Sequence, residues 1–129
     1  MAETRTYEGG CHCGRVRYRI ESSLTQVIEC NCSICAKRGT LWTFVKPAQF
    51  TMLKGDDTLA DYQFGKKVIH HRFCTKCGVR PFSRAGEQVA VRVNCLDGVD
   101  PQELIDAPVK YFNMRHDDMK SPPAETRHL

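Results

Sequence analysis

The stretch of sequence that decides the fold runs from residue 11 to residue 20 and reads CHCGRVRYRI. It begins with two cysteines and a glycine, and its last six residues alternate arginine with an apolar side chain: Val16, Tyr18 and Ile20. Alternation with a period of two is typical of a β-strand buried on one face. We therefore expect a strand whose apolar side enters the core. Its three arginines face water in the simpler interpretation and bind an anion in the alternative one.

Several further segments carry strand signals and are separated by turn-forming residues. They span residues 41–45, 50–53, 61–64, 68–73 and 88–95. Two short helices are expected, one over residues 33–38 and one beginning at Asp100, where Glu103 occupies the capping-box position. The sequence therefore predicts a mainly β protein with an antiparallel sheet and short helices.

Length and composition indicate one domain. The chain has 129 residues, of which 41% are hydrophobic and 26% charged, and it contains no repeat or linker long enough to divide it. We expect a single domain over residues 1–119 and a poorly ordered tail over residues 120–129, which holds Pro122 and Pro123. With no apolar leader at residues 1–5 and no run of 18 apolar residues, the expected location is the cytoplasm, although a nuclear protein would look the same.

Eight cysteines in a reducing compartment indicate metal ligands or reactive thiols rather than disulfides. Four of them form two close pairs, which combine into one closed tetrahedral zinc site of a structural kind. This four-cysteine group comprises Cys11, Cys13, Cys74 and Cys77. A second set, the three-cysteine group, comprises Cys30, Cys32 and Cys35. Three protein ligands leave the fourth position of a zinc ion open to water or substrate, which makes this second zinc the candidate catalytic one.

Other side chains compete for that fourth position. Cys95 shares the parity of an apolar strand face, so we expect it to pack in the core, with site-lining and ligand roles as alternatives. His12 adjoins the first cysteine pair and His70 and His71 precede the third cluster. Each is expected to be a surface or structural histidine, and His71 is also a candidate for supporting a ligand from behind.

Two further pairs of residues lie near the three-cysteine group in the sequence. Lys37 and Arg38 follow it closely and either face water at a helix end or offset thiolate charge and bind an anionic substrate. Trp42 and Phe44 share a strand parity and either pack in the core or line a pocket beside the cysteines.

The net charge does not indicate nucleic-acid binding. The formal value is +4, but seven zinc-bound thiolates and two Zn²⁺ ions together contribute −3, which leaves +1. Most of the apparent basicity therefore disappears once metal is bound.

The three cysteine clusters and the residues around them resemble the glutathione-dependent formaldehyde-activating enzyme family, also called the centromere protein V family. The matching motifs are Cys11-x-Cys13-Gly14-x-Val16-x-Tyr18, Cys30-Asn31-Cys32-Ser33-x-Cys35-x-Lys37-x-Gly39 and Phe73-Cys74-x-x-Cys77-Gly78. Leu53-x-Gly55, Tyr62-x-Phe64 and Cys77-Gly78-Val79-x-Pro81-Phe82 look like the centromere-protein-V branch in particular. The resemblance covers roughly residues 7 to 97.

This resemblance implies an antiparallel β fold of the Mss4-like (β-tent) kind. It also implies a structural zinc on the four-cysteine group, a catalytic zinc on the three-cysteine group, and a carbon-sulfur lyase that links formaldehyde and glutathione as S-hydroxymethylglutathione. The partner is then a small-molecule thiol, not a membrane or a nucleic acid. The segment Asn113–His116 departs from the family's usual ending, so the family pattern does not define the pocket wall there.

Three functions follow in order of preference. The first is a zinc-dependent carbon-sulfur lyase acting at the three-cysteine group. The second is a zinc-stabilised binding module with two structural metals, for which Arg15, Arg17 and Arg19 are the best supporting feature. The third is a thiol redox or metal-handling protein. The sequence indicates neither the physiological substrate nor an oligomeric state.

Overall fold

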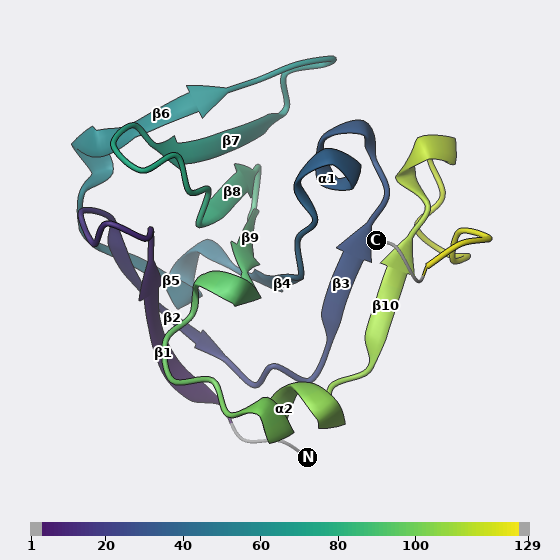
Figure 1. Ribbon diagram of the computed structural model, residues 1–129, viewed down its shortest axis with the longest axis horizontal. Helices are drawn as coiled ribbons and strands as arrows, with labels where there is room; N and C mark the ends of the chain where they lie inside the picture. The colour runs from purple at the N-terminus through teal and green to yellow at the C-terminus, as the bar shows by residue number, and fades with distance from the viewer. Residues whose placement is uncertain (1–3, 127–129) are drawn as a thin grey trace.

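The computed structural model describes residues 4–126, and these form two β-sheets with two short α-helices (Figure 1). The strands are β1 (Arg5–Gly10), β2 (Arg17–Ser22), β3 (Val27–Cys30), β4 (Trp42–Val45), β5 (Phe50–Lys54), β6 (Leu59–Tyr62), β7 (Ile69–Cys74), β8 (Phe82–Ala85), β9 (Gln88–Arg92) and β10 (Val109–Phe112). The helices are α1 (Ser33–Arg38) and α2 (Pro101–Asp106). The protein is mainly β with short helices, which confirms the expected fold class.

The strands divide into a small and a large sheet. The small sheet has the order β1-β2-β5, and the large one has the order β10-β3-β4-β9-β8-β7-β6. Neighbouring strands are antiparallel except β10 and β3, which pair in parallel with Val109 opposite Val27. Most of the sequence lies between these two strands, so their pairing depends on tertiary contacts rather than on a local turn.

The core lies between the two sheets and is built around aromatic rings. Tyr18 and Phe50 of the small sheet stack with their centroids 5.2 Å apart, and Phe50 is 4.7 Å from Phe82 of the large sheet. Val16, Tyr18 and Ile20 are each 0% exposed, which confirms the strand predicted from their alternation. That strand therefore fixes one face of the core next to the first cysteine pair.

One expected strand ends early. We predicted a strand over residues 88–95, but β9 ends at Arg92 and residues 93–95 form a single 3₁₀ turn. The Val93 N–H donates to the carbonyl of Leu41 at 2.8 Å, and the Leu96 N–H donates to the Val93 carbonyl at 3.1 Å. Because the chain turns back here, Cys95 does not continue the apolar strand face.

Both helices have the ends that the sequence predicts. Asp100 caps α2 by accepting from the Gln102 N–H at 2.8 Å, while Glu103 accepts from the Asp100 N–H at 2.9 Å. At the other helix, the Gly39 N–H donates to the Cys35 carbonyl at 2.8 Å and closes α1. This short helix holds the last cysteine of the three-cysteine group.

Residues 120–126 contain no helix or strand. Residues 1–3 of the expected domain and residues 127–129 of the expected tail lie outside the described residues. No helix in the described part of the chain has both the length and the apolar character needed to cross a membrane.

Candidate metal centres

The four-cysteine group joins the end of β1 to the end of β7. Cys11 and Cys13 follow β1, Cys74 ends β7, and Cys77 lies in the next turn. The four sulfurs lie within 4.8 Å of one another, and Cys13 Sγ is 3.6 Å from Cys11 Sγ and 3.7 Å from Cys74 Sγ. Sulfurs bound at about 2.3 Å to a tetrahedral zinc ion are about 3.8 Å apart, so the group fits such an ion.

Glycines reverse the chain behind both cysteine pairs. Gly14 and Gly78 have φ angles of 83° and 79°, in the left-handed region that glycine adopts without steric cost. Beyond the first turn, the Val16 N–H donates to Cys11 Sγ at 3.3 Å. Backbone N–H groups that point at sulfur favour the thiolate, which is the form that binds metal.

An arginine also supports the thiolate form in this group. Cys13 is exposed, and its pKa is lowered to about 6 because first the backbone N–H and then the side chain of Arg15 donate to its sulfur. Arg15 is itself exposed, as the strand pattern predicts. Its charge faces water and a cysteine of the group at the same time.

The three-cysteine group lies where β3 ends and α1 begins. Cys30 is the last residue of β3, Cys32 is the N-cap of α1, and Cys35 lies within the helix. Their sulfurs are within 4.8 Å of one another, and no further histidine, cysteine or acidic side chain among residues 4–126 joins them. A tetrahedral metal bound here would therefore keep one position free of protein ligands.

These three thiols share negative charge unevenly. Hydrogen bonds from Cys30 and Cys35 lower the pKa of Cys32 to about 2, and the same interaction raises the pKa of Cys30. The Cys32 N–H also donates to Cys30 Sγ at 3.5 Å. A group that stabilises a thiolate favours cation binding, because metal binding requires deprotonated ligands.

Apolar packing surrounds the buried side of the three-cysteine group. Trp42 is 4% exposed and packs with Ile28 and Cys35 in one buried cluster. Phe44 is partly exposed instead and stacks on Phe112, with 6.4 Å between the ring centroids. Of the two aromatic residues on this strand, Trp42 therefore adjoins the cysteines and Phe44 lies farther out.

The segment that follows β10 packs directly on the loop between Cys30 and Cys32. The Asn31 side chain donates to Asn113 Oδ1 at 2.7 Å and accepts from the Arg115 N–H at 3.1 Å. Arg115 Nε donates to the Asn31 carbonyl at 2.9 Å. The segment Asn113–His116, which the family pattern left undefined, thus fixes the backbone that carries two of the three cysteines.

Positive charge gathers beside the three-cysteine group. Arg80 is 4% exposed and lies over the Trp42 ring, with its Cζ 4.8 Å from the centroid. His71 is also buried, and its pKa is lowered to about 4 by burial first and then by the charges of Arg80 and Arg38. Arg80 was not among the predicted site residues. The signal in the sequence was a lone arginine between the turn of Cys77 and the apolar pair Pro81-Phe82 at the start of β8.

The other candidate ligands lie outside both groups. His12 is exposed beside the first cysteine pair, and His70 Nδ1 is 2.6 Å from Asp61 Oδ2 in an exposed pair. Cys95 is half-buried in the 3₁₀ turn after β9, and burial raises its pKa to about 11. The described structure brings none of these three side chains into a metal-binding cluster.

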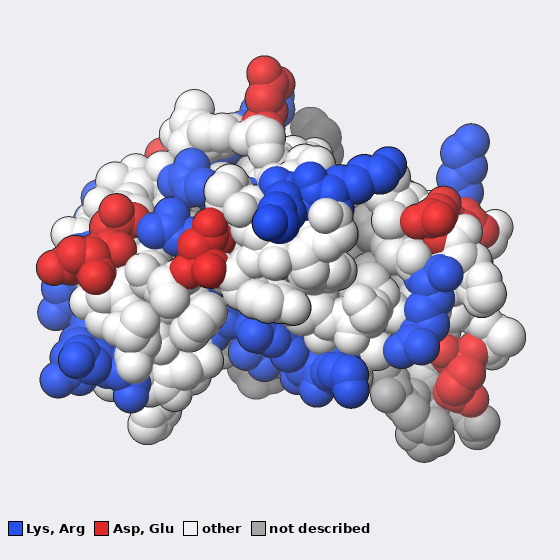
Figure 2. Space-filling view, turned by 90° about the horizontal axis from the view of Figure 1, so that it is seen from above, with Lys and Arg blue, Asp and Glu red and all other residues white. Residues whose placement is uncertain are grey.

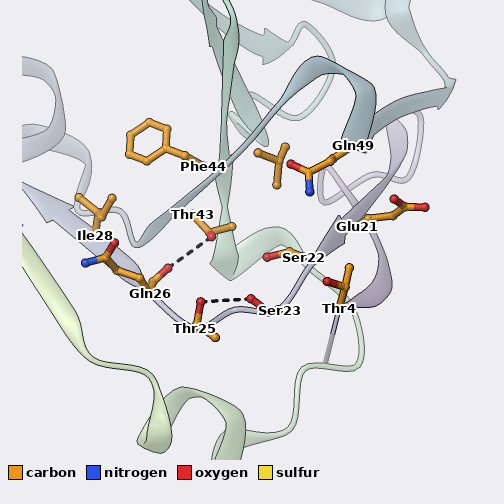
Figure 3. Close-up of a pocket in the computed structure, with 11 residues that line it drawn as sticks. Thr4, Glu21, Ser22, Ser23, Thr25, Gln26, Ile28, Thr43, Phe44 and Gln49 are labelled. Atoms are coloured by element: carbon orange, nitrogen blue, oxygen red, sulfur yellow. Dashed lines mark hydrogen bonds between the residues drawn. The ribbon is translucent and has the colours of Figure 1, made fainter. Parts of the chain in front are cut away.

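A cavity of about 260 Å³ lies between the loop after β2 and strand β4 (Figure 3). Its lining consists mainly of hydroxyl and amide side chains, and the labelled Thr25, Gln26 and Thr43 point toward its centre. No cysteine lines it. The cavity therefore shares no cysteine with either group.

Two comparisons place the chain among known proteins. The model of the family described as "Glutathione-dependent formaldehyde-activating enzyme" matches residues 6–114. The chain is also similar to a protein of Rhodobacter sphaeroides whose crystal structure is known, with 31% sequence identity, a TM-score of 0.71, and coverage of 79% of this chain and 98% of that chain. The matched residues include both cysteine groups. The chain belongs to the glutathione-dependent formaldehyde-activating enzyme family.

Proposed function

We propose that this protein is a zinc-dependent carbon-sulfur lyase that acts on the adduct of a small thiol and an aldehyde, such as S-hydroxymethylglutathione. The observation that carries the proposal is the convergence of Cys30, Cys32 and Cys35 with no fourth protein ligand among residues 4–126. Family membership supports the same reaction class. The expected partner is a small-molecule thiol, and the expected compartment is the reducing cytoplasm, in keeping with eight unpaired cysteines.

The reaction balances without a redox co-reactant. In the cleavage direction the carbon-sulfur bond breaks, its electron pair stays on sulfur, and the hydroxyl oxygen becomes the aldehyde carbonyl as it loses its proton. The sulfur then regains one proton from solvent, so one thiol and one aldehyde leave. A zinc ion at this site would supply an open position that stabilises the thiolate or polarises the carbonyl oxygen.

The chain's own residues position that chemistry. Cys30, Cys32 and Cys35 would hold the ion, and the contacts of Asn31 with the segment after β10 fix the loop between the first two. Trp42 covers the buried side of Cys35 and excludes water from it. Because Trp42 blocks the buried side, reactants can reach the ion only from the solvent side of the three-cysteine group.

We assign a structural role to the four-cysteine group. Its four sulfurs complete a tetrahedral zinc site, which leaves no position for a substrate. It also connects two segments more than sixty residues apart in the sequence, at the ends of β1 and β7. The proposal thus requires two zinc ions per chain with different tasks.

The alternative of a nucleic-acid-binding module has less support. Arg17 pairs with Asp97, and both Arg17 and Arg19 approach Glu8 within 4.0 Å. Figure 2 shows acidic side chains standing among the basic ones on the face viewed from above. Because neighbouring carboxylates offset the arginines, the strip on β2 is a weak electrostatic partner for a phosphate backbone.

The proposal is tested by the metal content and turnover of the purified protein. We expect two zinc ions per chain, and we expect NMR exchange spectroscopy to show interconversion of glutathione, formaldehyde and their adduct faster than the uncatalysed rate. Cys32→Ala should remove one zinc ion and the rate enhancement while the protein stays folded. A folded Cys32→Ala variant with the normal rate would refute the assignment of the three-cysteine group.

A further inference from the structure

Arg80 is a buried cation that forms no ion pair with an acidic side chain in the described part of the chain. It lies in the turn between the four-cysteine group and β8, and it is 4% exposed. Arg80 Nε donates to Ser83 Oγ at 3.0 Å, whereas its Nη1 atom is buried without a hydrogen-bond partner. Charged side chains are almost never fully buried unless they are paired. The environment of Arg80 must therefore supply a negative charge.

The contacts of Arg80 connect it to the three-cysteine group through Trp42. Within residues 4–126 no ion pair joins Arg80 to a carboxylate. Burial lowers the pKa of Arg80, while Cys35 and then Cys32 act in the opposite direction and raise it. The same guanidinium lies over the ring of Trp42, which packs against Cys35. The stacking on Trp42 and the hydrogen bonds to Ser83 hold the guanidinium against the tryptophan that packs on Cys35.

Building on the proposed function, we propose that Arg80 is the countercharge of the metal centre on the three-cysteine group and makes that centre prefer an anionic fourth ligand, a thiolate, over a neutral one. Three thiolates and a divalent ion carry a net charge of −1. A thiolate as fourth ligand makes the charge −2, whereas a neutral ligand leaves it at −1. A fixed positive charge in a buried site favours the ligand that adds negative charge.

Neighbouring arginines do not replace Arg80 in this role. Arg38 is exposed at the end of α1, where water and salt screen its charge. Arg92 donates from Nη2 to the Gly39 carbonyl at 3.2 Å and so is directed at the helix end. Arg80 remains charged at neutral pH, because burial lowers its pKa only to about 10. It is therefore a permanent positive charge of the site, acting as a positioning residue for the incoming ligand.

The test measures ligand preference rather than turnover. The full-length protein is loaded with Co²⁺, whose visible and sulfur-to-metal absorption bands report changes in the metal ligands. The two probes are 2-mercaptoethanol, which binds as an anion, and imidazole, which binds as a neutral ligand. Arg80→Met should weaken 2-mercaptoethanol binding about tenfold, which corresponds to one pKa unit, while imidazole affinity changes less than about twofold.

Matched variants separate charge from structure. Arg84→Met is the control, because Arg84 lies over Phe50 at 5.1 Å in the core and should leave both affinities unchanged. Arg80→Lys keeps the charge and should recover part of the preference for the thiol. If Arg80→Met does not fold, Ser83→Ala serves instead, since it releases the guanidinium and should weaken the thiol probe about threefold.

Each result is decisive. A loss confined to 2-mercaptoethanol supports the proposal. An equal loss for both probes means that Arg80 only maintains the local structure, and no loss means that it is not the countercharge; either result overturns the proposal. If the wild-type centre takes up Co²⁺ but neither probe, the open position itself is refuted, and with it the proposed function.

Discussion

The glycines on either side of the first cysteine pair allow the structural argument to be tested quantitatively. At Gly10 an added Cβ would lie 1.9 Å from the carbonyl oxygen of Val16, where real contacts are not shorter than 3.0 Å. The obstacle is backbone, so β1 and β2 would have to separate by about 1 Å locally. At Gly14 the φ angle is +83°, but an added Cβ would meet no atom within 4 Å.

These two geometries give different expected losses. Separation at Gly10 breaks the hydrogen bond from the Cys11 N–H to the Val16 carbonyl, which is 3.2 Å long, and loosens Val16, which is 0% exposed. A buried unsatisfied group costs about 1–3 kcal/mol and partial unpacking adds to it, so we expect Gly10→Ala to lose about 3–4 kcal/mol. Gly14→Ala costs about 1–2 kcal/mol of left-handed strain, which the lower entropy of the unfolded chain partly offsets, for a net loss of about 1 kcal/mol.

The assay is urea unfolding of zinc-loaded protein, followed by circular dichroism and accompanied by a zinc determination for each variant. Gly10→Ala should also retain less zinc, because the displaced Val16 N–H donates to Cys11 Sγ. If Gly10→Ala and Gly14→Ala lose the same free energy of unfolding, within about 0.5 kcal/mol, the close approach of the two strands does not limit this position.

Three further predictions address other contacts. Cys77→Ala should lower the free energy of unfolding by several kcal/mol, because structural zinc contributes on the order of 10 kcal/mol in small domains. Thermal melts measure this loss. An equal loss of stability on mutating a cysteine of the three-cysteine group would contradict the division of roles. Asn31→Ala should speed amide hydrogen exchange at residues 113–116 by about tenfold, since it removes two hydrogen bonds, and unchanged exchange would show that the segment is held otherwise. The Tyr7 hydroxyl donates to Glu103 Oε1 at 2.7 Å. This hydrogen bond is the largest of the causes that hold the pKa of Glu103 below its ordinary value. A lowered pKa stabilises the fold above about pH 4.5, and this contribution is lost as the pH falls through the folded-state pKa. Glu103→Gln should therefore be less stable than the wild type at about pH 7 and approach it near about pH 3. A difference in the free energy of unfolding that stays constant with pH in urea titrations would be inconsistent with this linkage.

Local patterns predicted the elements that depend on near neighbours. The alternation around Tyr18 predicted a half-buried strand, because successive side chains of a strand point to opposite faces of the sheet. The capping box at Asp100 predicted the start of α2, because its hydrogen bonds reach only three residues ahead. The division of seven of the eight cysteines into two groups followed from their spacing, since a metal site requires ligands that lie close together.

The sequence did not predict strands β1, β3, β8 and β10, and it did not predict the contacts between distant segments. The parallel pairing of β10 with β3 joins segments about eighty residues apart, and no local signal specifies a partner at that distance. The packing of Arg115 on Asn31 has the same origin. Arg80 was missed because a charged residue normally indicates exposure, and only the three-dimensional position of Trp42 shows that it is buried.

The two cysteine groups are connected to the fold in different ways. The four-cysteine group spans two strand ends from different sheets, so a metal bound there would link them. The three-cysteine group lies within one short turn and is braced by the contacts of Asn31 and by the packing of Trp42, neither of which requires a metal. A site that keeps its shape without its ion can exchange ligands at that ion without unfolding, which is the property that an open catalytic metal centre requires.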